Sequence, residues 1–228
     1  MLRLSNGKFN RNKKAFTLVE LVVVLVVLAI IGAMLVPALT GYIRRTRRVR
    51  YTENVHYALL AAQSIIQEEY FRPTADAAVS SDGYNVDWRN GAGKQLGNRV
   101  LELMDCGRGK NAGEPYILVF GIGHPDSQDL SEADKYTIYY VAYVADENSP
   151  AIFYVNGEWM YTYPRGNTRD YPITTGTEGF RNTIVTGDHE IPLQFYIVSN
   201  RTGKSDTQFW RGTARNTLEG HCAGNNGF

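Results

Sequence analysis

The sequence of 228 residues lacks the residue patterns that common enzyme classes need. It has two cysteines and four histidines, and the histidines are scattered without the spacing of a zinc site. The triplet Gly121-Ile122-Gly123 is too short for a phosphate-binding loop, and neither Lys-Ser nor Lys-Thr follows it. We therefore expect a non-enzyme, with no catalytic residues, no metal site and no cofactor.

Acidic residues are absent before Glu20, whereas basic residues are the minority after Arg50. The first 15 residues carry five basic side chains and no acidic one, and the part after Arg50 carries 22 acidic and 14 basic side chains. The net charge of +1 for the whole chain therefore hides a part with a net charge of −8. An acidic globular part makes nucleic acid an unlikely partner.

The longest apolar run extends from Phe16 to Leu39 and predicts a membrane-spanning helix. At 1.5 Å per residue it would be about 36 Å long, which is long for a signal-peptide core and sufficient for a span. No small-x-small cleavage pattern follows it, so we interpret it as a retained span. Five basic residues precede the run and five arginines follow it, so the positive-inside rule does not decide its orientation. The arginines are Arg44, Arg45, Arg47, Arg48 and Arg50.

Glu20 is a carboxylate four residues inside this apolar run. An unpaired carboxylate there costs roughly 2.5–3.5 kcal/mol on insertion scales. A buried charge is tolerated when it is paired, and we expect no partner nearby in the chain once the helix has formed. Glu20 therefore indicates a partner in another chain, where a charge pair would fix the axial offset of neighbouring helices. The alternative is an incidental glutamate that reaches the membrane interface.

The residues around Glu20 resemble the class III leader of type IV pilins and type II secretion pseudopilins. The segment reads Lys13-Lys14-Ala15-Phe16-Thr17-Leu18-Val19-Glu20, and the apolar residues after it include Gly32 and Pro37. The resemblance covers about the first 40 residues and implies that a prepilin peptidase cuts between Ala15 and Phe16 and methylates the new amino group of Phe16. This chain has Ala15 where the family more often has glycine.

The same resemblance implies partners for the apolar helix. Glu20 would pair with the ammonium group of Phe16 in a neighbouring copy, and the stretch from Gly32 to Pro37 would kink or loosen on filament entry, consistent with the missing proline N–H. The implied partners are other pilins, prepilin peptidase, the inner-membrane assembly machinery and, before assembly, membrane lipid. The implied location is a single-pass inner-membrane protein with its head outside, which then enters a surface or periplasm-spanning filament.

Residues 40–72 are expected to continue the helix as an amphipathic segment. Apolar residues recur at helical spacing at Val55, Leu59, Ala62 and Ile66, with Ala58 and Ile65 beside them, and Arg72-Pro73 marks the end. The five arginines fit lipid headgroups, the acidic heads of neighbouring subunits, DNA or a solvated helix face. We favour lipid or subunit electrostatics.

The remaining sequence predicts an antiparallel sheet that packs on the long helix, a pilin-like α+β fold. Residues 73–115 are a glycine-rich variable loop region with a short helix possible at Arg99–Met104, and residues 116–228 form the sheet and a C-terminal tail. Asn156-Gly157 predicts a hairpin turn. The expected strands are Tyr116–Ile122, Tyr136–Val144, Ala151–Val155, Glu158–Tyr163 and Leu193–Val198, with a possible last strand near Phe209-Trp210.

Three further sites carry weaker expectations. Cys106 and Cys222 could form a disulfide in an exported domain, and two thiols are the alternative. The carboxylates at Asp126, Asp129, Glu132 and Asp134 could hold calcium, but their order favours a solvated acidic loop. Asn200-Arg201-Thr202 fits a glycosylation acceptor.

These features together predict a structural subunit of a type IV pilus-like filament. Within the family, a type II secretion pseudopilin or a competence pilus subunit is the alternative. Outside the family, the alternative is a membrane-anchored protein with a single span and an exported binding domain.

Overall fold

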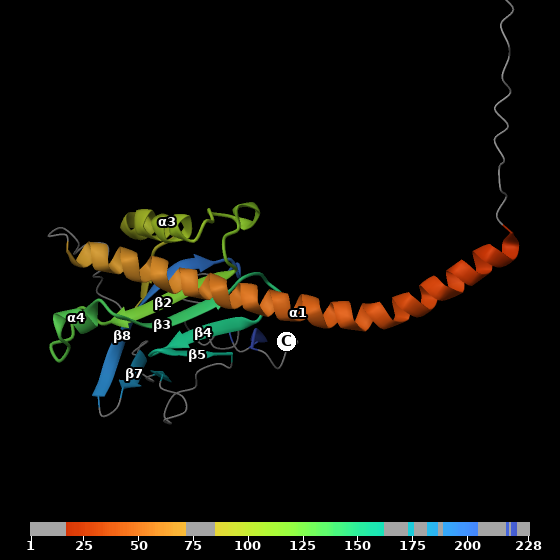
Figure 1. Cartoon of the computed structure of the whole chain (residues 1–228). Helices are drawn as coiled ribbons and strands as arrows, with labels where there is room; N and C mark the ends of the chain where they lie inside the picture. Colours follow the sequence, from red (N-terminus) through yellow and green to blue (C-terminus); the bar gives the residue numbers. More distant parts are fainter. Residues whose placement is uncertain are drawn as a thin grey trace, which may run out of the picture. The chain divides into compact units, whose positions relative to one another are not determined.

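The computed structural model describes residues 17–71, 85–161, 173–175, 182–186, 189–204, 218 and 220–222. The chain divides into two compact units, Met1–Thr46 and Arg47–Phe228. One long helix, α1 (Leu18–Tyr70), contributes to both units (Figure 1). It ends two residues before the expected boundary at Arg72-Pro73.

The first unit contains the N-terminal half of α1. Every described side chain in it is exposed except Gly32, which is partly buried. Pro37 lies inside the helix, and the Thr40 hydroxyl donates a hydrogen bond to the Pro37 carbonyl at 2.8 Å. The helix therefore continues through the proline.

The second half of α1 buries one face against the sheet. Val55, Ala58, Ala62, Ile65 and Ile66 are at most 1% exposed, which confirms most of the predicted apolar stripe. Leu59 is only partly buried. Ala61 is a further buried residue, and the small alanines allow close approach of the helix to the strands.

The sheet is mostly antiparallel, with strand order β5-β4-β3-β2-β8-β7-β6. β1 is the exception, because it pairs with β8 in parallel. The α+β prediction is therefore confirmed, although the sequence did not indicate β1, β6 or β7. The expected strand near Phe209-Trp210 lies outside the described residues. The strands are β1 (Asn85–Asp87), β2 (Ile117–Gly123), β3 (Ile138–Val144), β4 (Ala151–Val155), β5 (Glu158–Met160), β6 (Ile173–Thr175), β7 (Asn182–Thr186) and β8 (His189–Asn200).

The β4–β5 connection is the predicted Asn156-Gly157 hairpin turn. Both residues have positive φ angles, 46° at Asn156 and 93° at Gly157, as a two-residue hairpin of this kind requires. β4 and β5 pair antiparallel on either side of it.

The part of residues 73–115 that the structure describes contains regular elements besides loops. They are β1, the short helices η1 (Gly91–Gly93) and η2 (Lys110–Ala112), and α3 (Lys94–Leu103), which begins five residues before the predicted helix. A further short helix, α4 (Glu132–Lys135), lies between β2 and β3. Arg108 fastens this region to the sheet, because its guanidinium donates to the carbonyls of Trp88 and Val198 and pairs with Glu114 at 3.1 Å.

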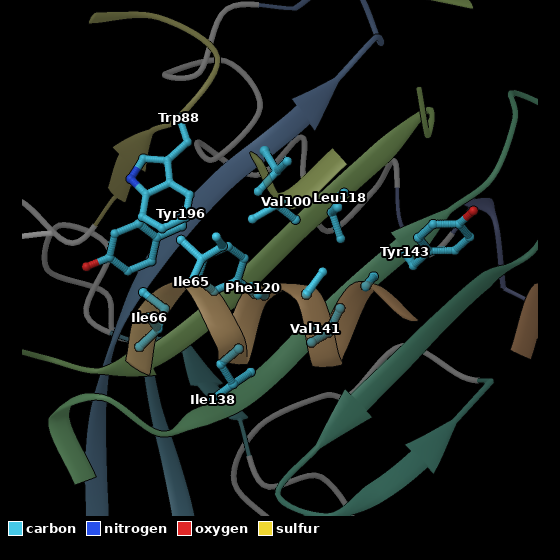
Figure 2. Close-up of a cluster of buried hydrophobic side chains, with 14 of the residues drawn as sticks. Ile65, Ile66, Trp88, Val100, Leu118, Phe120, Ile138, Val141, Tyr143 and Tyr196 are labelled. Carbon is cyan, nitrogen blue, oxygen red and sulfur yellow. The ribbon is translucent and has the colours of Figure 1, made fainter. Parts of the chain in front are cut away.

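The sheet separates two apolar clusters. The first contains the buried face of α1, part of α3, and alternate side chains of the central strands such as Phe120, Val141 and Tyr196 (Figure 2). The second contains side chains on the opposite face, such as Val119, Ala142 and Phe195. A strand with buried residues on both faces appears as a continuous apolar run, which is why β2 and β3 were recognisable in the sequence.

Candidate functional site

The N-terminus of α1 is a capping box built by Thr17 and Glu20. The Glu20 amide donates to the Thr17 hydroxyl oxygen at 3.2 Å, and the Thr17 amide donates to Glu20 Oε2 at 3.2 Å. The Thr17 hydroxyl also donates to Glu20 Oε2 at 3.0 Å. The pair satisfies two backbone donors that a helix leaves unpaired at its start.

The capping box gives Glu20 hydrogen-bond donors within its own chain, but it does not test the expectation that a partner in another chain neutralises the charge of Glu20. The sequence contained the signal, since Thr-x-x-Glu before an apolar run is the usual signature of a capping box. The partial positive charge at the helix N-terminus also favours a carboxylate there. Hydrogen bonds do not neutralise the carboxylate, however, and within the described residues no cation pairs with Glu20.

The predicted processing site directly precedes this cap in the sequence. Ala15 and Phe16 fall outside the described residues, so cleavage and methylation remain predictions. Thr17 would become the second residue of the processed chain. The capping carboxylate would then lie one turn from the new amino group.

The part of α1 that follows the capping box has an apolar and exposed surface. Among the described helices, α1 is the one that is long and apolar enough to cross a membrane, and its most apolar window has a mean hydropathy of 3.1 with no residue buried. A side chain at Gly32 would meet no atom within 4 Å. The exposed apolar half of α1 and the motif at its start fit single-pass membrane anchoring.

The arginines follow the apolar part of α1. The side chains of Arg45, Arg47 and Arg50 are exposed, and none of them forms an ion pair with another described residue. The side chains of Arg44 and Arg48 lie outside the described part of the structure. The lipid and subunit interpretations both remain proposals.

The cysteines are not joined by a disulfide in the structure. Cys106 packs beside the cluster that includes α1, and Cys222 packs beside the cluster on the other face of the sheet. Each thiol instead donates to a backbone carbonyl, Cys106 to Leu101 at 3.3 Å and Cys222 to Leu218 at 3.2 Å. Burial, with a smaller contribution from Glu114, raises the pKa of Cys106 to about 11. The structure thus has both cysteines as free thiols on opposite faces of the sheet, which agrees with the alternative of two thiols.

The acidic loop and the glycosylation sequence offer no site in the structure. Hydrogen bonds from Ser131 and Tyr139 to Asp134 hold α4 in place and lower the pKa of Asp134. Among the residues that the structure describes, no group of three or more His, Cys, Asp or Glu could hold a metal ion. Asn200 is 8% exposed, and its amide donates to the Lys204 carbonyl at 3.3 Å, so it is not presented for glycosylation.

Comparison with known families gives one match, to the prokaryotic N-terminal methylation motif at residues 10–36. Comparisons with curated proteins and with solved structures returned no match. The match includes the capping box and most of the exposed apolar half of α1. Residues 10–36 of this chain therefore match the prokaryotic N-terminal methylation motif, the pattern that is typical of the class III prepilin leader region of type IV pilins and pseudopilins.

Proposed function

We propose that this chain is a structural subunit of a type IV pilus-like filament. In this proposal a prepilin peptidase cuts between Ala15 and Phe16, removes the leader and methylates Phe16. The apolar half of α1 then packs in the filament core. The observation that carries the proposal is the exposed apolar half of α1, whose first turn holds a carboxylate.

The exposed apolar surface of α1 supports assembly, because a surface of this size needs to be buried against lipid or other helices. A contiguous apolar surface of a whole membrane-length helix is far larger than soluble monomers normally expose. Lipid covers it while the subunit is in the membrane, and the same helices of other copies cover it in a filament.

Glu20 supplies the register in this proposal. In the low dielectric of a filament core, its charge is tolerated only with a positive partner. The ammonium group of Phe16 in a neighbouring copy is such a partner, and it exists only after the leader is removed. Cleavage and assembly are thereby coupled, and an uncut chain remains a membrane monomer.

The mass of the chain isolated from its native membrane tests this proposal. We expect a chain that begins at Phe16 and carries one additional methyl group. A chain that still begins at Met1 would overturn the proposal and favour an anchored binding protein.

A Glu20→Ala variant tests the register. It should insert and lose its leader normally, but enter filaments at least about tenfold less than the unchanged chain, because the ammonium group loses its partner. Glu53→Ala is the matched control, since Glu53 is an exposed glutamate of α1 beyond the apolar run. Normal assembly of Glu20→Ala would remove the registry mechanism.

The leader motif is common to pilins and pseudopilins, so imaging must distinguish the filament type. Long surface filaments that contain this chain support a pilus subunit. Short filaments confined to the cell envelope, with loss of protein export when the chain is deleted, support a pseudopilin. Loss of DNA uptake supports a competence pilus.

A further inference from the structure

A groove opens on the second unit between α1, the end of α3 and the sheet. Its volume is about 480 Å³, within the range of pockets that hold a few side chains. Its wall comes from three parts of the chain that are distant in sequence. The lining residues include Arg50, Asn54 and Tyr57 of α1, Leu103 and Asp105 at the end of α3, and Tyr143 of β3.

The floor of the groove contains the buried phenol of Tyr143. Tyr143 is 4% exposed, and the Asn54 side chain hydrogen-bonds to it. Burial raises the pKa of Tyr143 to about 12, so the phenol keeps its proton at physiological pH.

The rim combines apolar and acidic side chains. Tyr57 and Leu103 are large hydrophobic residues that line the groove and are 56% and 55% exposed. Asp105 lines the groove, and Glu102 directly precedes Leu103; both are exposed and form no ion pair with another described residue. Such a rim fits a partner that carries cations on long aliphatic stems.

We propose that this groove receives the arginine-bearing stretch of α1, residues 44–50, from a second copy of this chain. This inference rests on the proposed filament function and names a contact within that filament. The stretch has five arginines within seven residues, and those with described side chains are exposed and without ion pairs. Their stems would lie on Tyr57 and Leu103, and their guanidinium groups would reach the carboxylates on the rim.

The groove and the arginine-bearing stretch share Arg50 but otherwise consist of different residues, so the proposed contact is head-to-tail, which suits a polymer. A head-to-tail contact of this kind does not close on itself as an isologous dimer does, and repetition produces a helical filament. Arg50 also lines the groove but makes no ion pair with Asp105 of its own chain, so the carboxylate remains available.

Site-specific photocrosslinking in assembled filaments of the full chain tests the contact. A benzophenone amino acid in place of Leu103 should crosslink to residues 42–50 of another copy, as mapped by mass spectrometry. The same probe in place of Glu158, an exposed residue of the edge strand β5, should not reach that stretch. Crosslinks from position 103 only to other segments, to lipid or to another protein would overturn the inference.

A charge exchange provides the second test. Glu102→Arg alone and Arg47→Glu alone should each lower filament incorporation about threefold to tenfold, and the double variant should recover most of it. Glu158→Arg, which makes the same charge change away from the groove, should assemble normally. Both positions 102 and 47 are exposed, so these changes leave folding intact.

The outcomes separate this inference from the function on which it rests. Filaments of chains that begin at Phe16, with neither the crosslink nor the charge recovery, overturn the groove contact alone. Chains that keep the leader and form no filament overturn both.

Discussion

At the scale of single residues, Thr17 and Glu20 show how one side chain serves two structures. In the single chain, Glu20 accepts the amide and hydroxyl hydrogens of Thr17 and closes the first turn of α1. In the proposed filament, the same carboxylate binds the ammonium group of another copy. The capping box keeps the carboxylate at the helix start, where that second partner would arrive.

Replacing Thr17 should loosen the first turn. Thr17→Val removes the hydroxyl that accepts the Glu20 amide and should destabilise the start of the helix by about 1 kcal/mol, the usual cost of losing such a cap. Hydrogen exchange of the amides at residues 18–21 in detergent micelles measures the effect. Thr17→Ser keeps the hydroxyl and is the control. Equal protection in both variants would contradict the role of the cap.

Asp87 is a second residue whose hydrogen bonds have a measurable consequence. Burial alone would raise its pKa, but hydrogen bonds from Arg89 and Asn90 outweigh burial and lower the pKa to about 2. A carboxyl with a lowered pKa in the folded state adds stability above its unfolded pKa of about 4, and this stability is lost as the pH falls towards about 2.

The Asp87→Asn variant should therefore lose stability mainly at neutral pH. Its unfolding free energy should lie below that of the unchanged chain at pH 6, and the difference should shrink towards pH 2. Urea unfolding at several pH values, followed by the fluorescence of the buried Trp88, measures this difference. A constant difference across the pH range would show that the ionised carboxylate contributes nothing.

At the scale of elements, α1 is one helix with two different environments. Its N-terminal half exposes apolar residues throughout, whereas its second half buries one stripe against the sheet. The arginines lie between these two parts. The first half thus depends on partners outside the chain, and the second half depends on the sheet.

Truncations on the two faces of the second half should differ sharply. Ile66 is fully buried, so Ile66→Ala should lower the unfolding free energy by about 2–5 kcal/mol through lost burial and a cavity. Leu60 is 53% exposed on the same helix, and Leu60→Ala should change it by about 0.5 kcal/mol or less. Urea unfolding of the full chain in detergent micelles compares them. Similar costs would mean that α1 does not pack on the sheet as described.

At the scale of the whole molecule, the described part of the second unit is held by packing and hydrogen bonds, with its two cysteines as free thiols. Cys106 and Cys222 occupy opposite faces of the sheet, and the two apolar clusters hold the strands between them. Arg108 ties the segment between α3 and β2 to the sheet without a disulfide.

Both cysteines should therefore react as thiols. Alkylation of the unfolded chain without any reductant should add two labels by mass, and a sample reduced beforehand should have the same mass. Labels that appear only after reduction would show that the two cysteines are paired.

The sequence was sufficient for the features that depend on neighbouring residues. The apolar span, the methylation motif and the Asn156-Gly157 turn are local, because helix and turn preferences act over about four residues. The continuous apolar runs of β2 and β3 were recognisable for the same reason. The capping role of Thr17 is local too, because the Thr-x-x-Glu signature is present in the sequence.

Other features depended on contacts between residues that are far apart in the chain. Pairing of β1 with β8 joins residues about 110 positions apart, and such partners cannot be inferred from local periodicity. The same holds for the placement of Cys106 and Cys222 on opposite faces and for the burial of Asn200. The sequence alone thus determined the methylation motif and which part of the chain is apolar enough to enter a membrane. The tertiary structure decided which residues the sheet brings together, because only packing creates those neighbours.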